Sequence, residues 1–223
     1  MGEFYALLIE GLPGIGKSTL IDALIRRHVD SSDPRRIRSF LHLARTHSYG
    51  PLAPAEDRDT LTLEANLQLL ERIAQTLEWL HAELQHNDKQ FFELIDCLHL
   101  THCLRPGILT RDVAAPFDLR LAMGGCKLLL LTGSKETIWN RVIRGRTDSQ
   151  FLTQYALQFG RIQQLIHAHF VEEQAEFVRV FSQSVMDKRL FENGCLDNII
   201  EAAYTFWLER PDTERVRFHT TGA

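Results

Sequence analysis

A short glycine-rich segment carries the clearest chemical signal in this sequence. Residues 9–19 read IEGLPGIGKST, so Gly11, Gly16, Lys17 and Ser18 fit the spacing G-x-x-x-x-G-K-S. Glycines at these places let successive backbone N–H groups turn toward phosphate oxygens, while the lysine reaches the outer phosphates and the serine hydroxyl binds Mg²⁺. The segment therefore predicts a site for a nucleoside triphosphate and its metal ion.

The sequence on both sides of this loop supports that interpretation. An apolar run, FYALLI, precedes the loop, and apolar residues at helical spacing follow it. An ordinary glycine-rich turn is the alternative, but the complete motif between a strand and a helix is far more specific. We assign Lys17 a catalytic role and Ser18 a role as metal ligand. We expect triphosphate contacts from the whole loop: Gly11, Gly14, Ile15, Gly16, Lys17, Ser18 and Thr19.

A carboxylate follows a second apolar run. The run FFELID at 91–96 predicts a buried strand with Asp96 at its carboxyl end. In parallel α/β sheets ligands bind outside the carboxyl ends of the strands, so Asp96 is expected beside the glycine-rich loop. It would there be catalytic, as a ligand of Mg²⁺ or as the base that takes a proton from the acceptor. The alternative is an acid that only caps the next turn.

Strands and amphipathic helices alternate along the chain. Strands are predicted at 4–9, 37–45, 91–96, 126–133 and 177–183, and helices after the loop and at 60–85, 112–125, 136–146, 151–177 and 198–208. This alternation predicts an α/β fold, a P-loop three-layer sandwich in which a parallel five-stranded sheet has helices on both faces. We expect residues 1–223 to form a single domain.

Four features together resemble the thymidylate kinase and deoxynucleoside kinase group of P-loop kinases. These are the pair Glu10-Gly11 before the loop, the strand-end Asp96, the stretch LLLLTGSKETIWNRVIRGR at 128–146, and the long helix that follows. The resemblance implies an ATP- and Mg²⁺-dependent kinase, and homodimerisation through the long helices. In that group an arginine usually follows the strand-end acid, whereas here Cys97 follows Asp96. The identity of the acceptor is therefore open.

The resemblance also implies a lid that carries arginines, at about 141–155. Arg141, Arg144 and Arg146 lie close together around a glycine. Guanidinium donors stabilise the charge that develops on a transferring phosphoryl group, so Arg141 and Arg146 are interpreted as catalytic and Arg144 as a triphosphate contact. The alternative is a solvated helix end whose arginines interact only with the helix dipole.

Residues for binding the acceptor are sought in three other segments. Tyr49 could stack on a flat substrate, and Glu56 and Asp57 lie in the same loop, for which a plain surface loop is the alternative. Arg105 and Arg111 could replace the missing arginine. His99 is assigned to the acceptor pocket, with a buried, hydrogen-bonded histidine as the alternative. The surrounding CLHLTHC does not have the ligand spacing of a zinc site.

Composition excludes several classes of function. The chain has 25 basic and 29 acidic residues and a net charge of -4, which argues against a general nucleic-acid binder. No apolar run reaches the ~20 residues needed to span a bilayer, and the first residues lack the basic region of a signal peptide. We therefore expect a cytoplasmic protein with neither nucleic acid nor a membrane as partner.

Two function classes remain. The first is a kinase that moves the γ-phosphoryl group of ATP to a nucleoside, a nucleotide or a similar small hydroxyl compound. The second is a regulatory NTPase or switch without a small acceptor. A GTPase is not supported, because the nearest match to its N/T-K-x-D guanine motif is SKET at 134–137, which lacks both ends.

Overall fold

The structure is a computed structural model of the 223-residue chain. It describes residues 2–29, 36–42, 63–86, 88–104, 111–146, 159–160, 162–193 and 196–210. Tyr49, Glu56, Asp57 and Arg105 lie outside the described residues, as do the predicted lid beyond position 146 and the side chains of Arg111 and Arg146. Their predicted roles stay predictions.

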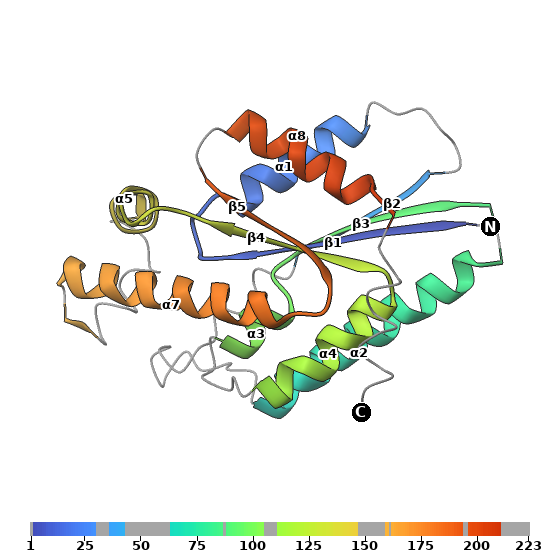
Figure 1. Cartoon of the computed structure of the whole chain (residues 1–223), viewed down its shortest axis with the longest axis horizontal. Helices are drawn as coiled ribbons and strands as arrows, with labels where there is room; N and C mark the ends of the chain where they lie inside the picture. The colour runs from blue at the N-terminus through green and yellow to red at the C-terminus, as the bar shows by residue number, and fades with distance from the viewer. Residues whose placement is uncertain are drawn as a thin grey trace.

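One parallel sheet forms the centre of the described structure (Figure 1). Its strands are β1 Glu3–Gly11, β2 Arg36–His42, β3 Gln90–Asp96, β4 Cys126–Thr132 and β5 Asp187–Glu192, in the order β2-β3-β1-β4-β5. All four neighbouring pairs are parallel. The central strands β1 and β4 are almost continuously buried, because both of their faces are covered, as expected for parallel sheets. The predicted α/β fold with a parallel sheet is confirmed.

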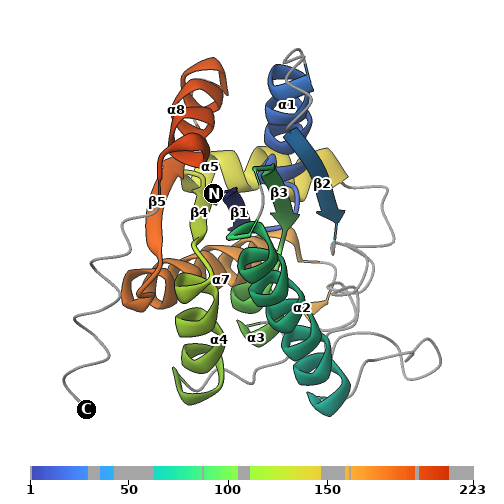
Figure 2. The same ribbon diagram turned by 90° about the vertical axis from the view of Figure 1, so that its right-hand side faces the viewer.

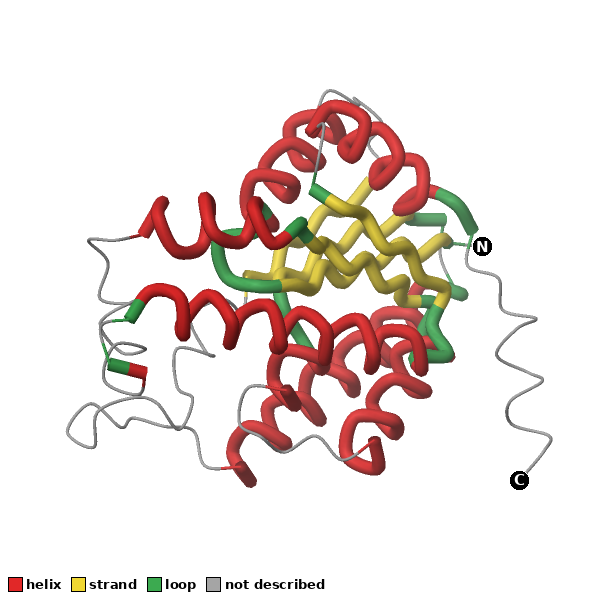
Figure 3. Tube along the Cα trace, turned by 60° about the vertical axis from the view of Figure 1, so that its left-hand side comes forward, coloured by secondary structure: helices red, strands yellow, loops and turns green. Residues whose placement is uncertain are grey.

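Helices cover the two faces of the sheet (Figures 1 and 2). On one face lie α1 Lys17–Val29 and α8 Leu196–Leu208. On the other lie α2 Leu63–Leu84, α3 His99–Leu104, α4 Arg111–Met123 and α7 Gln163–Gln183. The short helix α5 Lys135–Ile138 lies beyond the carboxyl ends of the strands, where β1 leads into the glycine-rich loop. The tube in Figure 3 shows the same layers from the side.

Long side chains fix α8 against the sheet. The indole N–H of Trp207 donates to the carbonyl oxygen of Tyr5 in β1 at 3.0 Å. From β4, the buried ammonium of Lys127 donates to the carbonyl oxygens of Phe206 and Glu209, where α8 ends. These carbonyls have no partner within the helix, so Lys127 acts as a C-terminal cap. The last helix is thereby joined to two central strands.

The predicted strand at 177–183 is wrong. These residues form the last turns of α7, and the fifth strand is β5, at Asp187–Glu192. Phe170, Phe177, Val180 and Phe181 are buried at helical spacing, so the apolar run FVRVF continues the inner face of a helix. The strand itself reads DKRLFE and is largely exposed at the sheet edge, which gives it little apolar pattern.

The predicted helix at 151–177 is not continuous: Gly160 has a φ of +60°, α7 begins at Gln163, and residues 151–158 lie outside the described residues. The remaining elements agree with the predictions to within a few residues, apart from two details. Helix α3 was not predicted, because its six residues are too few to show a period. The predicted helix at 136–146 consists of three pieces: α5, a π-helical turn at Trp139–Ile143, and a 3-10 turn at Arg144–Arg146. No helix in the described part of the chain is long and apolar enough to cross a membrane.

Candidate functional site

The glycine-rich loop joins β1 to α1 with a backbone that requires glycine. Gly11 and Gly16 have φ angles of +139° and +113°. A Cβ on Gly11 would collide with the carbonyl oxygen of Leu131 in β4. These positions are open only to glycine, so the loop can wrap closely and direct its N–H groups to one place at the start of α1.

Lys17 is the first residue of α1, and its side chain folds back over the loop. Its ammonium donates to the carbonyl oxygens of Gly11 at 2.8 Å and Leu12 at 3.0 Å. The side chain is buried, with 8% of the residue exposed. An ammonium has three N–H groups, so it can donate to a phosphate oxygen while it keeps both of these bonds. Lys17 is therefore positioned in advance for an anion held by the loop.

Asp96 lies at the carboxyl end of β3, beside the start of the loop. In the parallel register Asp96 is paired with Ile9 of β1, two residues before Gly11. The next residue, Cys97, donates its thiol to Asp96 Oδ1 at 3.2 Å and its backbone N–H to the carbonyl of Ile9 at 3.0 Å. The predicted placement of this acid next to the glycine-rich loop agrees with the structure.

The thiol of Cys97 is buried and protonated at neutral pH. Burial raises its pKa to about 12, and the nearby positive charge of Lys17 only partly opposes this effect. Cys97 also has a φ of +61°, the only positive φ among the described residues that are not glycine. This unusual backbone turns the chain from β3 toward α3.

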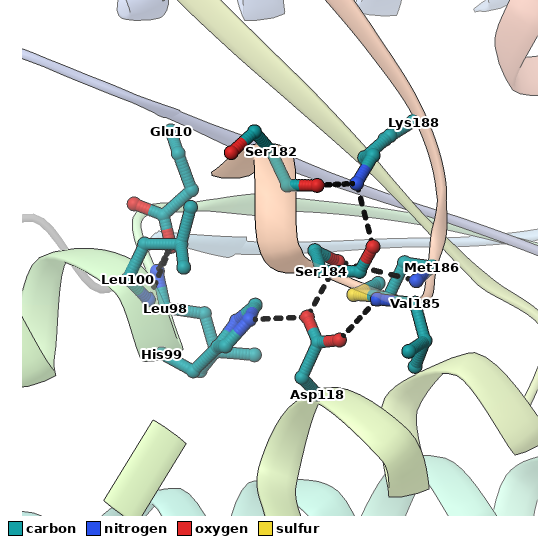
Figure 4. A network of polar contacts seen from close by, with 10 residues as sticks. All are labelled: Glu10, Leu98, His99, Leu100, Asp118, Ser182, Ser184, Val185, Met186 and Lys188. Carbon is teal, nitrogen blue, oxygen red and sulfur yellow. Dashed lines mark hydrogen bonds and ion pairs between the residues drawn. The ribbon is translucent and has the colours of Figure 1, made fainter. Parts of the chain in front are cut away.

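Glu10 fixes the turn that follows Asp96 (Figure 4). Its Oε1 accepts the backbone N–H of Leu98 at 2.8 Å and that of Leu100 at 3.1 Å, and its Oε2 accepts the hydroxyl of Thr101 at 2.5 Å. Glu10 is fully buried. The carboxylate thus satisfies donors at the start of α3 and holds them to the residue before Gly11. From the sequence, Glu10 stands out only as half of the Glu10-Gly11 pair.

His99 does not line an open pocket, which corrects its assignment to the acceptor. Its ring is fully buried, and its Nε2 lies 3.0 Å from Asp118 Oδ1 (Figure 4). Asp118 also accepts the hydroxyl of Ser184 and the backbone N–H of Val185, at 2.6 and 2.7 Å. Burial acts to raise the pKa of the Asp118 carboxyl, but these hydrogen bonds outweigh it and lower the pKa. The cluster joins α3, α4 and the turn after α7.

Arg141 is brought to the glycine-rich loop. Its Nη1 lies 3.2 Å from the place that a Cβ on Gly16 would occupy. Arg141 is in the π-helical turn, and such turns change the direction of the residues that follow them and often occur at functional sites. The side chains of Arg141 and Arg144 are exposed. The structure therefore places Arg141 against the loop, whereas the side chain of Arg146 lies outside the described residues.

The turn between β4 and α5, which precedes Arg141, is fixed by side-chain contacts. The side-chain amide of Gln174 in α7 forms two hydrogen bonds with Gly133, one to its N–H and one to its carbonyl, both at 2.9 Å. A Cβ on Gly133 would lie 2.7 Å from Ile15 Cδ1, so the turn between β4 and α5 packs directly on the loop. Ser134 then caps α5 by accepting the N–H of Thr137.

Asn193 is a site residue that sequence analysis missed. Its Nδ2 donates to the carbonyl of Ile15 and lies 3.0 Å from the Cβ position of Gly16. Its own N–H donates to the carbonyl of Thr132 at 2.7 Å. It follows β5, 178 residues after the loop that it contacts, so no local pattern could have indicated it.

The oxygen donors at this end of the sheet are of the kind that Mg²⁺ prefers. Asp96 offers a carboxylate, and Ser18 offers an exposed hydroxyl in the first turn of α1. Mg²⁺ keeps several waters and needs few protein ligands. Within the described ranges there is no group of three or more His, Cys, Asp or Glu residues that could hold a metal ion. The residues therefore fit a hydrated Mg²⁺ carried by phosphates.

Solved structures that are similar to this chain include three of low sequence identity. The YorR protein from Bacillus subtilis, solved in complex with phosphorylated GDP, has a TM-score of 0.55 at 12% identity, over 90% of this chain and 94% of that one. A gluconokinase from Sinorhizobium meliloti 1021 has a TM-score of 0.48 at 13% identity, over 98% of each chain. An uncharacterized protein from Eubacterium ventriosum ATCC 27560 has a TM-score of 0.42 at 9% identity, over 92% and 97%. No protein-family model and no curated protein match the chain.

Of these three, the YorR protein has a TM-score above 0.5, and it supports the α/β arrangement across most of the chain. The resemblance to thymidylate and deoxynucleoside kinases stays a prediction, as do the single domain and the homodimer. What the structure brings together at one end of the sheet is the glycine-rich loop, Asp96, Asn193 and Arg141.

Proposed function

We propose that this protein is an ATP- and Mg²⁺-dependent phosphotransferase. It transfers the γ-phosphoryl group of ATP to the hydroxyl of a small acceptor, a nucleoside, a nucleotide or a compound of similar size. The observation that carries the proposal is the meeting of Lys17, Asp96 and Arg141 around the glycine-rich loop. The YorR protein, which shares the fold, was solved in complex with phosphorylated GDP, and this supports nucleotide binding by the present chain.

Each group has a role that follows from its position. The backbone N–H groups at the start of α1 hold phosphate oxygens, and the Lys17 ammonium holds the outer phosphates. Arg141 lies against Gly16 of the loop and stabilises the charge that develops on the transferring group. Asp96 and Ser18 would hold Mg²⁺, which when bound neutralises charge on the β- and γ-phosphates.

The transfer is a simple displacement. The acceptor oxygen forms a bond to the γ-phosphorus as the bond from that phosphorus to the β,γ-bridging oxygen breaks, and ADP leaves with the bond's electron pair. The acceptor hydroxyl gives up its proton to a base or to solvent. Asp96 ends the strand beside β1 and is our candidate for that base if it does not bind the metal.

The test is acceptor-dependent formation of ADP. The full chain is incubated with ATP, Mg²⁺ and a panel of nucleosides, nucleoside monophosphates and sugar acids, and ADP is measured with and without each acceptor. Lys17→Ala is the matched inactive control, and we expect it to stay folded and to lose about a hundredfold or more in turnover. Turnover of Lys17→Ala that equals the wild type would contradict the proposal.

The same experiment separates the second function class. Tight ATP binding with slow ADP formation that no acceptor accelerates would favour a regulatory NTPase. Calorimetry that shows no binding of ATP with Mg²⁺ to folded protein would exclude both classes.

A further inference from the structure

We propose that Cys97 is a positioning residue whose thiol orients the carboxylate of Asp96. This inference rests on the proposed function and deepens it, because it names a group that acts on the candidate metal ligand. Cys97 itself would not touch ATP or the acceptor. It would hold Asp96 Oδ1, so that the carboxylate presents a fixed face to Mg²⁺ or to the acceptor proton.

The contact between the two side chains is the first support. The Cys97 thiol donates to Asp96 Oδ1 at 3.2 Å, within the range for a sulfur donor. Cys97 is 1% exposed and Asp96 is 2% exposed, so water does not compete strongly for this hydrogen bond. A neutral donor fixes the orientation of the carboxylate and leaves its negative charge in place.

The backbone at Cys97 is the second support. A φ of +61° is unfavourable for a residue with a Cβ and costs of the order of 1 kcal/mol or more. Glycine would adopt this turn without strain, but it would offer no donor to Asp96. The backbone angle alone would favour glycine at this position, yet the residue is a cysteine, whose thiol donates to Asp96.

The surroundings hold this geometry on both sides. The N–H of Cys97 donates to Ile9 in β1, and the next N–H, that of Leu98, donates to the buried carboxylate of Glu10. The turn is therefore fixed to the two residues that lead into the glycine-rich loop. These backbone contacts place the start of the turn beside the loop, and the thiol contact restricts the rotation of the Asp96 carboxylate.

Three variants at position 97 separate positioning from packing. Cys97→Ala removes the donor, Cys97→Ser keeps a donor of similar size, and Cys97→Gly removes the donor but accepts the backbone angle. Cys126→Ala is the matched control, because Cys126 is equally buried but pairs with Ala6 at the far end of β4. Each variant is checked for folding by circular dichroism and thermal unfolding.

The measurement is ATP binding by calorimetry at increasing Mg²⁺, together with kcat and KM for ATP where turnover is seen. We expect Cys97→Ala and Cys97→Gly to weaken the apparent Mg²⁺ affinity about tenfold, with kcat falling more than KM rises. Cys97→Ser should restore most of the affinity, and Cys126→Ala should match the wild type. If Cys97→Ala does not fold, Cys97→Gly gives the result.

Two results would overturn the inference while the proposed function stands. The first is an Mg²⁺ affinity of Cys97→Gly equal to that of wild-type protein. The second is a loss in Cys126→Ala as large as that in Cys97→Ala, which would mean that any buried thiol has this effect. If the wild-type protein binds no ATP with Mg²⁺, the proposed function fails and this inference fails with it.

Discussion

Replacing Glu10 tests whether one buried carboxylate joins the glycine-rich loop to the turn after Asp96. In Glu10→Ala, the N–H groups of Leu98 and Leu100 and the hydroxyl of Thr101 lose their acceptor in a site closed to water. Each buried donor without a partner costs about 1–3 kcal/mol. Allowing for partial relaxation, we expect the free energy of unfolding to fall by about 3–5 kcal/mol.

Glu10→Gln should cost much less. The glutamine keeps one carbonyl oxygen, which can accept both N–H groups, and the hydroxyl of Thr101 can rotate to accept from the new amide. The loss of charge weakens each hydrogen bond, but a neutral group is also easier to bury. We expect a loss of about 1 kcal/mol, so the two variants should differ by at least about 2 kcal/mol.

Urea unfolding followed by far-UV circular dichroism and tryptophan fluorescence measures these differences. The control is Glu201→Gln, which removes a carboxylate that is paired with Arg27 but exposed. Exposed ion pairs contribute about 1 kcal/mol or less. If Glu10→Ala loses no more stability than this control, Glu10 does not hold α3 as the structure indicates, and the fixed position of Asp96 loses its explanation.

Two further predictions concern Arg141 and Lys127. Because Arg141 lies against Gly16, Arg141→Ala should lower kcat about a hundredfold while ATP affinity changes little. The control is Arg144→Ala, which should lower kcat less. Equal losses of kcat in the two variants would contradict the role of Arg141. Burial lowers the pKa of Lys127 to about 8, so between pH 8 and 10.5 the unfolded chain holds a proton that the folded chain releases, and stability rises with pH. In urea unfolding, the free energy of unfolding of the wild-type protein minus that of Lys127→Met should rise by about 1.3 kcal/mol between pH 7 and pH 9. If this difference does not change with pH, the carbonyls at the end of α8 offset the effect of burial on the Lys127 pKa.

The parts of the site that follow one another in the chain could be predicted from the sequence. The glycine-rich loop is a continuous motif, and Asp96 follows a strand whose apolar run is unmistakable. The ends of parallel strands meet at one edge, so placing Asp96 beside the loop needed only the order of elements.

The parts that depend on distant contacts could not be predicted. Asn193 donates to the carbonyl of Ile15, which lies 178 residues earlier in the chain. Both carboxylate oxygens of Glu10 accept hydrogen bonds from residues of α3, about 90 residues later. His99 is buried because Asp118, which the sequence analysis did not single out, lies opposite it in the fold. The direction of Arg141 depends on a π-helical turn, and apolar periodicity does not distinguish this turn from an α-helix.

The pair of hydrogen bonds between Gln174 and Gly133 has a mechanical consequence. One planar amide bonds both polar groups of a single residue, so α7 cannot slide along its axis or roll without breaking both bonds together. Gly133 in turn has no spare room against Ile15. Any movement of α7 would therefore displace Gly133, which lies between the arginine-bearing turn and the glycine-rich loop. We expect α7, this turn and the loop to move together.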